Sequence, residues 1–367
     1  MRRLTFHSEY IDTLDLFFRE SISDLKSLGC EVDVSSIAGF SYFSSTSEPS
    51  FIKSSYLPFL PSLVRRCLQA CFYLLEFTSR SPDNVSVLVT PTLIIVAPFV
   101  SLFRNFNYII ISQGQLEAEG LLTSYIYRLL LLFSVLRATC SYSCNLMEKF
   151  RWDFYPYHLL KRKLKILPWY GVCLSRSKIN LYKDALVRSS PSININSFCY
   201  LGRISDSKGC TDLIRLFSHS LFSRFSLTLA GPIECDPSIL GLISNLPSNI
   251  TLQDSIPSND IPDWLSGFDI LITFSRGESI GSATLEALMC GKPVISLLNS
   301  GSCQVLRHSV DSFLLDDVEP SSVLSAIDYC QKNYTSMSSA ASSLCSLVLP
   351  RPSYLSSSIF NFLAPRI

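Results

Sequence analysis

The chain has 367 residues, enough for two domains of ordinary size that each bury a core. Its 31 Lys and Arg residues balance its 30 Asp and Glu residues, so no charge excess indicates nucleic acid as the main partner. Charged residues make up only 17% of the chain and the mean hydropathy is +0.29, which is apolar for a freely soluble protein. A membrane surface therefore stays among the candidate partners.

The cysteines and the start of the chain favour the reducing cytoplasm. The thirteen cysteines are scattered, and no apolar signal-peptide core follows the first residues, MRRLTFHSEY. The closest pairs, Cys67 with Cys71 and Cys140 with Cys144, have no histidine or second cysteine pair at zinc-site spacing. We expect these cysteines to be small apolar side chains rather than metal ligands.

The first half of the chain alternates short β-rich runs with longer amphipathic ones. The uncharged run at 84–103 has about the length of a membrane span, but Pro91 and Pro98 interrupt it, and a strand followed by a helix opening at Pro91 explains it as well. The predicted strands are 3–7, 30–37, 85–89, 108–112, 138–143 and 163–168, and the predicted helices include 11–28, 58–78 and 121–137.

The second half repeats this alternation more regularly, as parallel βαβ units do. The predicted strands are 197–202, 225–231, 249–255, 269–275, 293–297 and 311–316, each followed by a segment of helical length. Residues 171–196 have neither periodicity and are rich in Ser and Asn, which is typical of a linker. The prediction is α/β: two doubly wound Rossmann-like domains, 1–180 and 181–345, with a final helix at 346–367 that could return to the first domain.

The most informative segment, 268–297, is predicted to be a strand, a loop, a helix ended by Gly291, and a second strand. The loop Arg276–Gly281 then follows the carboxyl end of a strand, where open α/β sheets bind their ligands. Ser282 can cap the next helix, whose first N–H groups would face an anionic ligand.

This segment resembles the family 4 retaining glycosyltransferases, which carry two glutamates separated by seven residues before a glycine and a Pro-Val strand. Glu278 and Glu286 have that spacing within ESIGSATLEALMCGKPVIS. The resemblance implies that Glu278 touches the transferred sugar and that Glu286 binds the ribose hydroxyls. Carboxylates suit both roles, because they offer only acceptors and can bridge neighbouring hydroxyls. The alternative is a pair of exposed glutamates. The other implied substrate contacts here are Ser279, Ile280, Gly281 and Ser282.

A second stretch, FCYLGRISDSKGCTDLI (198–214), resembles the first strand of the family's donor domain, which ends in Gly-Arg before a Lys-Gly helix start. It implies that Gly202 contacts the donor and that Arg203 and Lys208 stabilise the departing diphosphate. Lys208 stands where a positive charge opposes the helix dipole, a placement that a bound anion would make favourable. Two solvated cations are the alternative.

The first domain resembles the family less closely. YIIISQGQLEAEGLL (108–122) is similar to the strand and loop in which many members carry His-Gly or Arg-Gly, and here Gln113 and Gly114 stand at that place. No glycine-rich loop follows residues 3–7. Three explanations stay open: the acceptor side is remodelled, the start of the chain has lost residues, or the protein is a degenerate member. For Gln113-Gly114 an ordinary polar turn is the equal alternative.

Other features divide between structural and functional interpretations. The four histidines form no pair at metal-ligand spacing, and only His7, at the end of the first strand, could point into the cleft. The basic cluster at 161–165 and the arginines within 56–77 flank apolar stretches, which suits either solvated faces or contact with an anionic membrane. We expect no metal and no cofactor.

Taken with the resemblance, these features imply a GT-B glycosyltransferase that is retaining and independent of metal. Its partners would be a nucleoside-diphosphate sugar, a glycan or lipid-linked acceptor and an anionic membrane, but not nucleic acid. The expected setting is bacterial cell-surface polysaccharide synthesis (O-antigen, lipopolysaccharide or capsule), in the cytoplasm or on the inner face of the cell membrane. A sugar-nucleotide epimerase of the same fold and a non-catalytic binding protein are the alternatives.

Overall fold

The structure is a computed structural model, and it divides the chain into two compact units. Unit 1 comprises Met1–Leu174 with Pro350–Ile367, and unit 2 comprises Ser175–Leu349. The residues that the structure describes are 3–8, 22–36, 62–80, 84–104, 106–112, 121–143, 164–166, 181–182, 184–186, 194–234, 237–276, 281–299, 301–348 and 359.

Unit 1 is built on a six-stranded parallel sheet in the order β2-β1-β3-β4-β5-β6. All six predicted strands are present. Their bounds are β1 Arg3–Ser8, β2 Glu31–Ser36, β3 Val85–Leu88, β4 Tyr108–Ser112, β5 Cys140–Ser143 and β6 Leu164–Ile166.

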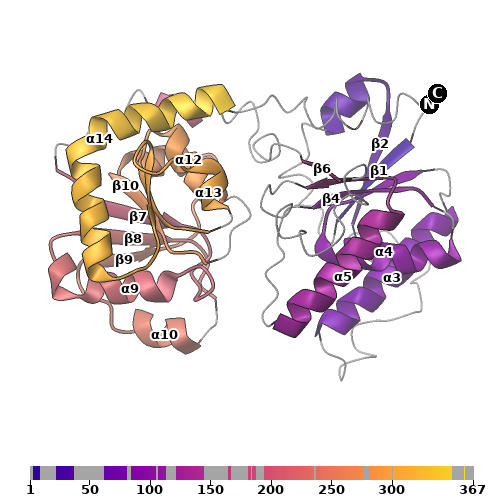
Figure 1. The fold of residues 1–367 in the computed structure, drawn as a ribbon, viewed down its shortest axis with the longest axis horizontal. Helices are drawn as coiled ribbons and strands as arrows, with labels where there is room; N and C mark the ends of the chain where they lie inside the picture. The colour runs from indigo at the N-terminus through magenta and orange to yellow at the C-terminus, as the bar shows by residue number, and fades with distance from the viewer. Residues whose placement is uncertain are drawn as a thin grey trace. The chain divides into compact units, whose positions relative to one another are not determined.

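Three helices cover one face of this sheet (Figure 1). They are α3 Ser62–Arg80, α4 Pro91–Phe103 and α5 Leu121–Arg137, and residues 22–27 form a further helical segment between β1 and β2. The uncharged run at 84–103 is therefore a strand and a helix that begins at Pro91, as predicted. Within the described parts of the chain, no helix has the length and apolar character needed to cross a membrane.

Unit 2 has a second six-stranded parallel sheet, in the order β12-β11-β10-β7-β8-β9. Its strands also match the prediction. They are β7 Ser197–Leu201, β8 Ser226–Ala230, β9 Ile250–Gln253, β10 Ile270–Thr273, β11 Val294–Leu297 and β12 Ser312–Leu315. The helices are α9 Cys210–Ser218, α10 Pro237–Ile243, α11 Ile261–Ser266, α12 Ser282–Met289, α13 Ser302–Val305 and α14 Pro320–Val348, with a 3-10 turn at Ser220–Phe222.

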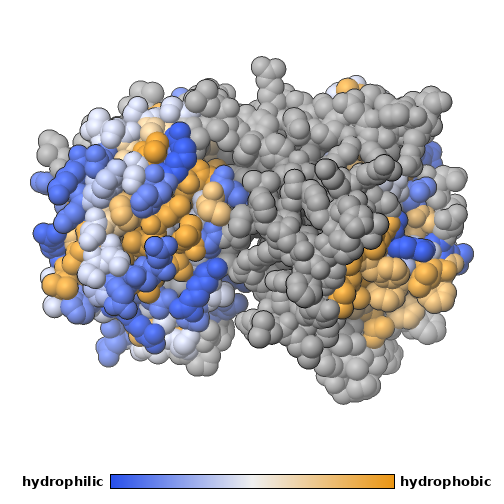
Figure 2. All heavy atoms as spheres, viewed as in Figure 1, coloured by the Kyte–Doolittle hydropathy of each residue, from blue (hydrophilic) through white to orange (hydrophobic). Residues whose placement is uncertain are grey.

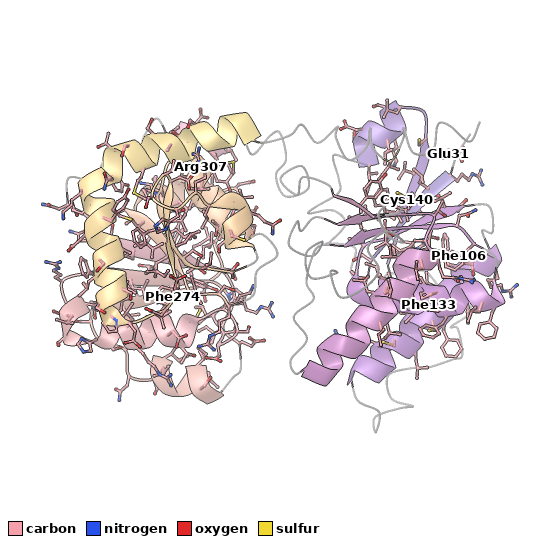
Figure 3. All side chains as sticks on the ribbon, in the orientation of Figure 1. Glu31, Phe106, Phe133, Cys140, Phe274 and Arg307 are labelled. Carbon is pink, nitrogen blue, oxygen red and sulfur yellow. The ribbon has the colours of Figure 1, made fainter. Side chains whose placement is uncertain are left out.

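Aromatic and aliphatic side chains fill the core of unit 2. Phe198 of β7 packs edge-on against Phe217 and Phe225, with ring centroids 5.5 Å apart in both pairs. Phe274, just beyond β10, is fully buried in the same core (Figure 3). The apolar strands and helix faces thus meet as the sequence periodicity requires.

One carboxylate joins the amino ends of two central strands. Asp269 lies directly before β10, and its Oδ2 accepts hydrogen bonds from Asn196 N, Ser197 N and Ser197 Oγ at 2.8–2.9 Å. Its carbonyl accepts a bond from the hydroxyl of Tyr334 in α14 at 3.0 Å. These bonds fix the start of β10 beside the start of β7.

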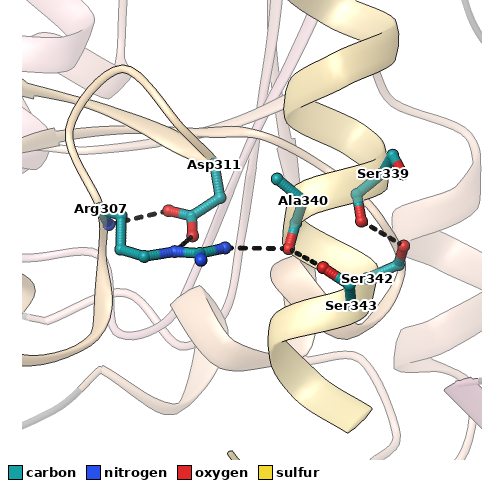
Figure 4. A network of polar contacts seen from close by, with 6 residues as sticks. All are labelled: Arg307, Asp311, Ser339, Ala340, Ser342 and Ser343. Atoms are coloured by element: carbon teal, nitrogen blue, oxygen red, sulfur yellow. Dashed lines mark hydrogen bonds and ion pairs between the residues drawn. The ribbon is translucent and has the colours of Figure 1, made fainter. Parts of the chain in front are cut away.

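The last helix, α14, changes direction along its length (Figure 1). Serine and asparagine side chains along it donate to its own carbonyls, which bends helices. Ala340 O accepts both Ser343 Oγ at 2.9 Å and Arg307 Nη2 at 3.1 Å, and Asp311 holds Arg307 (Figure 4).

Candidate functional site

The carboxyl edge of the unit 2 sheet contains a topological switch point. β7 pairs with β10, with Phe198 opposite Ile270, while the later strands β8 and β9 lie on one side of this pair and β11 and β12 on the other. Open α/β sheets bind ligands outside the carboxyl ends of the strands at such a point. Both stretches that resemble the glycosyltransferase donor domain leave the sheet here, one after β7 and one after β10.

Two glycines let the backbone pack closely at this edge. Gly209, which has a left-handed backbone (φ +73°), caps α9, and a Cβ there would lie 2.3 Å from the carbonyl oxygen of Phe274 at the end of β10. Gly231 has φ +142°, and a Cβ there would lie 2.0 Å from the carbonyl oxygen of Gly202. Only glycine allows these approaches, so the start of α9 is packed directly onto the end of β10.

The helices that follow β7 and β10 begin without a side-chain cap. Gly209 caps α9 and Gly281 caps α12, both with left-handed backbones, and neither helix receives a side-chain capping bond. The prediction that Ser282 is the cap is wrong, since Ser282 is the first residue within α12. Glycine lacks the side-chain oxygen that would satisfy the first N–H groups. Cys210 N of α9 donates to Ser205 O and Thr284 N of α12 donates to Gly281 O, while the N–H groups of Ser282 and Ala283 at the start of α12 are available to water or an anionic ligand.

The two predicted cations lie on the loop between β7 and α9. Arg203 directly follows Gly202, and its guanidinium is 3.7 Å from a carboxylate oxygen of Glu234, with both side chains about half exposed. An ion pair this exposed and this long contributes little to stability, so the Arg203 side chain can bind another anion instead. Lys208 is half-buried and stands just before the cap of α9. The structure thus brings Gly202, Arg203 and Lys208 to the switch-point edge.

A salt bridge that the sequence did not reveal joins the two halves of this edge. Arg276, which follows β10, donates to Asp212 in the first turn of α9 at 2.7 Å. Aspartate is favoured near a helix N-terminus, so the sequence could indicate the position of Asp212 in the first turn of α9. It could not indicate that Arg276 is its partner. The contact ties the segment directly after β10 to α9, the helix that follows the Gly-Arg strand.

Glu286 is buried in α12, one turn from its start, and is only 8% exposed. The hydroxyl of Tyr182 donates to its Oε1 at 2.9 Å. Burial raises the pKa of Tyr182, and the neighbouring Glu286 carboxylate raises it further, so the phenol keeps its proton and stays a donor. The structure therefore places Glu286 in a fixed, enclosed position rather than on an exposed helix end.

Tyr182 is a contact that sequence reasoning missed. It lies in the stretch interpreted as a linker, where residues 181–182 and 184–186 are helical in the structure. Tyr182 is fully buried, and Leu186 lies close to Gly291, where a Cβ would be 2.6 Å from Leu186 Cδ1. Such short helical segments within a non-periodic stretch give no signal for this packing, since they are too few residues to show a period.

Several predicted site residues lie outside the described residues. These are Glu278, Ser279 and Ile280, which come before α12 in the sequence, and Gln113 and Gly114, which come after β4.

His7 is a core residue of unit 1, so the prediction that it could point into the cleft is wrong. Its side chain is fully buried, its Nδ1 lies 2.7 Å from the hydroxyl of Tyr73, and its ring packs edge-on against Phe77. Burial lowers the pKa of His7 to about 3, so it is neutral at physiological pH.

Among the described residues, no group of three or more His, Cys, Asp or Glu side chains could hold a metal ion. Metal independence stays a prediction.

The architecture is that of the GT-B glycosyltransferases: two Rossmann-like units, each with a parallel sheet. Sucrose-phosphate synthase of Thermosynechococcus elongatus superposes with a TM-score of 0.74 at 14% identity, covering 99% of this chain and 98% of that one. HepE of Anabaena, whose structure contains UDP-glucose, gives a TM-score of 0.67 at 14% identity over 100% of both chains. At this identity the likeness defines the fold.

Residues 195–333 match the family model described as glycosyl transferases group 1. The Vi polysaccharide biosynthesis protein VipC/TviE of Salmonella typhi is 36% identical over 75 residues, which are 20% of this chain and 13% of that protein. The chain matches only 13–36% of the length of its curated relatives. The matched range contains β7, α9, β10 and α12, the elements that form the candidate site.

Proposed function

We propose that the protein is a glycosyltransferase that moves a sugar from a nucleoside-diphosphate donor, bound by unit 2, to a glycan or lipid-linked acceptor. The observation that carries this proposal is the switch point between β7 and β10. The two stretches that resemble the donor domain are about 70 residues apart in sequence, yet they leave the sheet from neighbouring strands. The bound UDP-glucose of HepE supports a uridine nucleotide as the first donor to test.

In this proposal each residue at the edge acts on a different part of the donor. Arg203 and Lys208 neutralise the diphosphate as charge gathers on the leaving group, together with the uncapped N–H groups of α12. Glu286 accepts hydrogen bonds from the ribose hydroxyls, and Glu278 contacts the transferred sugar. Gly202 and residues 279–282 line the donor, while Gln113 and Gly114, which follow β4, contact the acceptor.

The finer features of the proposal follow the resemblance to family 4. We propose retention at the anomeric carbon, no requirement for a metal or cofactor, and a role in bacterial cell-surface polysaccharide synthesis. The similarity to a Vi polysaccharide protein supports this last role. The protein would work in the cytoplasm, at the inner face of the cell membrane.

Calorimetry with two ligands on two variants tests the donor site. Glu286→Gln should weaken UDP and UDP-sugar binding together by about 1.5–3 kcal/mol, because a charge-assisted bond to the ribose is lost. Glu278→Gln should bind UDP like the wild type while turnover falls, because its partner is the sugar. Glu319→Gln, an exposed site in the same unit, is the matched control.

Four outcomes would contradict the proposal in different ways. UDP binding unchanged in Glu286→Gln removes the ribose assignment. Interconversion of the donor sugar without any acceptor indicates an epimerase. Donor binding without turnover over a panel of acceptors indicates a binding protein, and loss of activity with chelator, restored by a divalent ion, contradicts metal independence.

A further inference from the structure

The helical side of unit 1 exposes large apolar side chains. On α4, Phe99, Leu102 and Phe103 have the i, i+3, i+4 spacing of one helix face, and Leu102 and Phe103 are 58% and 79% exposed. Figure 2 shows apolar side chains gathered over this part of unit 1. We call the set the α3–α5 apolar face: Phe72, Phe99, Leu102, Phe103, Leu129 and Leu136.

The members lie on helices that pack side by side. α4 contacts both α3 and α5, and the ring of Phe99 lies 6.0 Å from that of Phe133 on α5. Leu129 and Leu136 are two turns apart on α5, so they share a face of that helix. Large apolar side chains gathered in this way mark an interaction surface, whereas single exposed ones do not.

Positive charge surrounds this face. Arg66, Arg104 and Arg137 are exposed, and no carboxylate among the described residues forms a salt bridge with any of them. Arg137 is oriented along the end of α4, since its Nε and Nη2 donate to Ser101 Oγ and O at 3.1 Å. The sequences of α3, α4 and α5 contain five arginines and a single acid, Glu76, although the whole chain is nearly neutral.

The charge decides between two occupants of this face. A second copy packed face to face about a twofold axis would bring the same arginines together without carboxylates to pair them. An anionic lipid surface supplies both the apolar layer for phenylalanine and leucine and the phosphates for arginine. We propose that the α3–α5 apolar face docks on an anionic membrane, with Leu102 and Phe103 entering the headgroup boundary. This inference locates the membrane contact and does not depend on the donor chemistry.

Sedimentation of the full chain with vesicles tests the surface. The chain should bind vesicles that contain phosphatidylglycerol at low salt, bind phosphatidylcholine vesicles weakly, and be released from the former as ionic strength rises. Phe103→Ser should reduce the partition coefficient by roughly tenfold or more, because a phenylalanine side chain no longer enters the lipid. Arg104→Glu should reduce it by at least about fivefold, because one cation near the surface is lost.

Matched controls lie on unit 2. Leu221→Ser changes a leucine that is 54% exposed, which is similar to the 58% exposure of Leu102. Arg215→Glu reverses the charge of an exposed arginine. Neither control should alter vesicle binding, and UDP binding by calorimetry should be the same in all four variants. Vesicle binding that is absent in the wild type, or equally reduced by the controls, overturns the proposal. The proposal is also overturned if Phe103→Ser lowers the mass in solution from that of a dimer to that of a monomer while vesicle binding is unchanged.

Discussion

The two units have sheets of the same size and all-parallel direction, but the described residues at their carboxyl edges differ. In unit 2 the edge is polar and close-packed, with left-handed glycines, uncapped helix starts and the Arg276–Asp212 pair. In unit 1 the end of β1 carries His7, a neutral histidine enclosed by Tyr73 and Phe77. The comparison teaches that the shared fold does not define a ligand site, and that the chemistry at the strand ends does.

The largest expected difference between the units is the loss of stability when a glycine is replaced by alanine. Gly231→Ala should destabilise unit 2 by roughly 2–5 kcal/mol, because a Cβ would lie 2.0 Å from Gly202 O on a backbone with φ +142°. Gly29→Ala in unit 1 should cost only about 1–2 kcal/mol, because φ is +87° but nothing lies within 4 Å. Urea unfolding followed by hydrogen exchange in each unit measures both. Equal losses would mean that close packing at the unit 2 edge is not decisive.

The next difference concerns turnover. Lys208→Ala should lower the transfer rate by about 10²–10³-fold without changing the unfolding midpoint, because a charge that stabilises the departing diphosphate is removed. Lys26→Ala, an exposed lysine of unit 1, should leave the rate unchanged. Steady-state kinetics on both variants checks this, and an unchanged rate in Lys208→Ala would remove the cation from the mechanism.

A smaller difference between the units is how far acid pH lowers their stability. Because the pKa of His7 is about 3 in the folded state and about 6.5 unfolded, the unfolded state binds the proton first as pH falls. Unit 1 should therefore lose about 2 kcal/mol between neutral pH and pH 5 through this group alone. His7→Gln should reduce that loss, whereas His219→Gln, at an exposed site of unit 2, should not. Hydrogen exchange of the β1 amides against pH gives the result, and identical pH profiles for wild type and His7→Gln would contradict it.

The smallest difference separates the two ends of the unit 2 sheet. Tyr182→Phe and Tyr334→Phe each remove one buried hydroxyl, at the carboxyl and amino sides, and each should lower stability by about 0.5–1.5 kcal/mol. Only Tyr182→Phe should also weaken UDP binding, because its hydroxyl holds Glu286. A double-mutant cycle with Glu286→Gln measures the coupling, and additive effects on UDP affinity would show that Tyr182 is structural only.

Much of the fold could be predicted from the sequence, because local residue patterns indicate the strands and helices. Most of the twelve strands in the described residues follow from short runs rich in β-branched and aromatic residues, and α5 spans the predicted 121–137. The helix caps were harder to predict. Ser282 was a reasonable cap by residue type, but the cap is Gly281, because the left-handed turn before α12 requires a glycine there. A residue preference cannot reveal a backbone angle set by packing.

Candidate site residues could be proposed from sequence only where a motif contains them. Arg203, Lys208 and Glu286 were predicted because motif spacing places each of them on a strand-loop-helix unit, and their roles stay predictions. Tyr182 was not predicted, because its contact with Glu286 joins residues 104 positions apart. His7 could not be assigned from sequence, since a strand end can face a ligand or a helix, and here the aromatic side chains of α3 cover it.

The bond network of Asp269 has a consequence for the order of assembly. β7, β8 and β9 follow one another along the chain, so their pairing closes short loops, whereas the bonds from Asp269 to Ser197 join residues 72 positions apart. Closing that longer loop costs more chain entropy and depends on residues synthesised later. A folding intermediate that contains only β7, β8 and β9 therefore has half of the edge and no switch point, so it cannot bind a ligand there. Ligand binding at the proposed donor site would thus be a property of the completed sheet, and would require that β10 has joined β7.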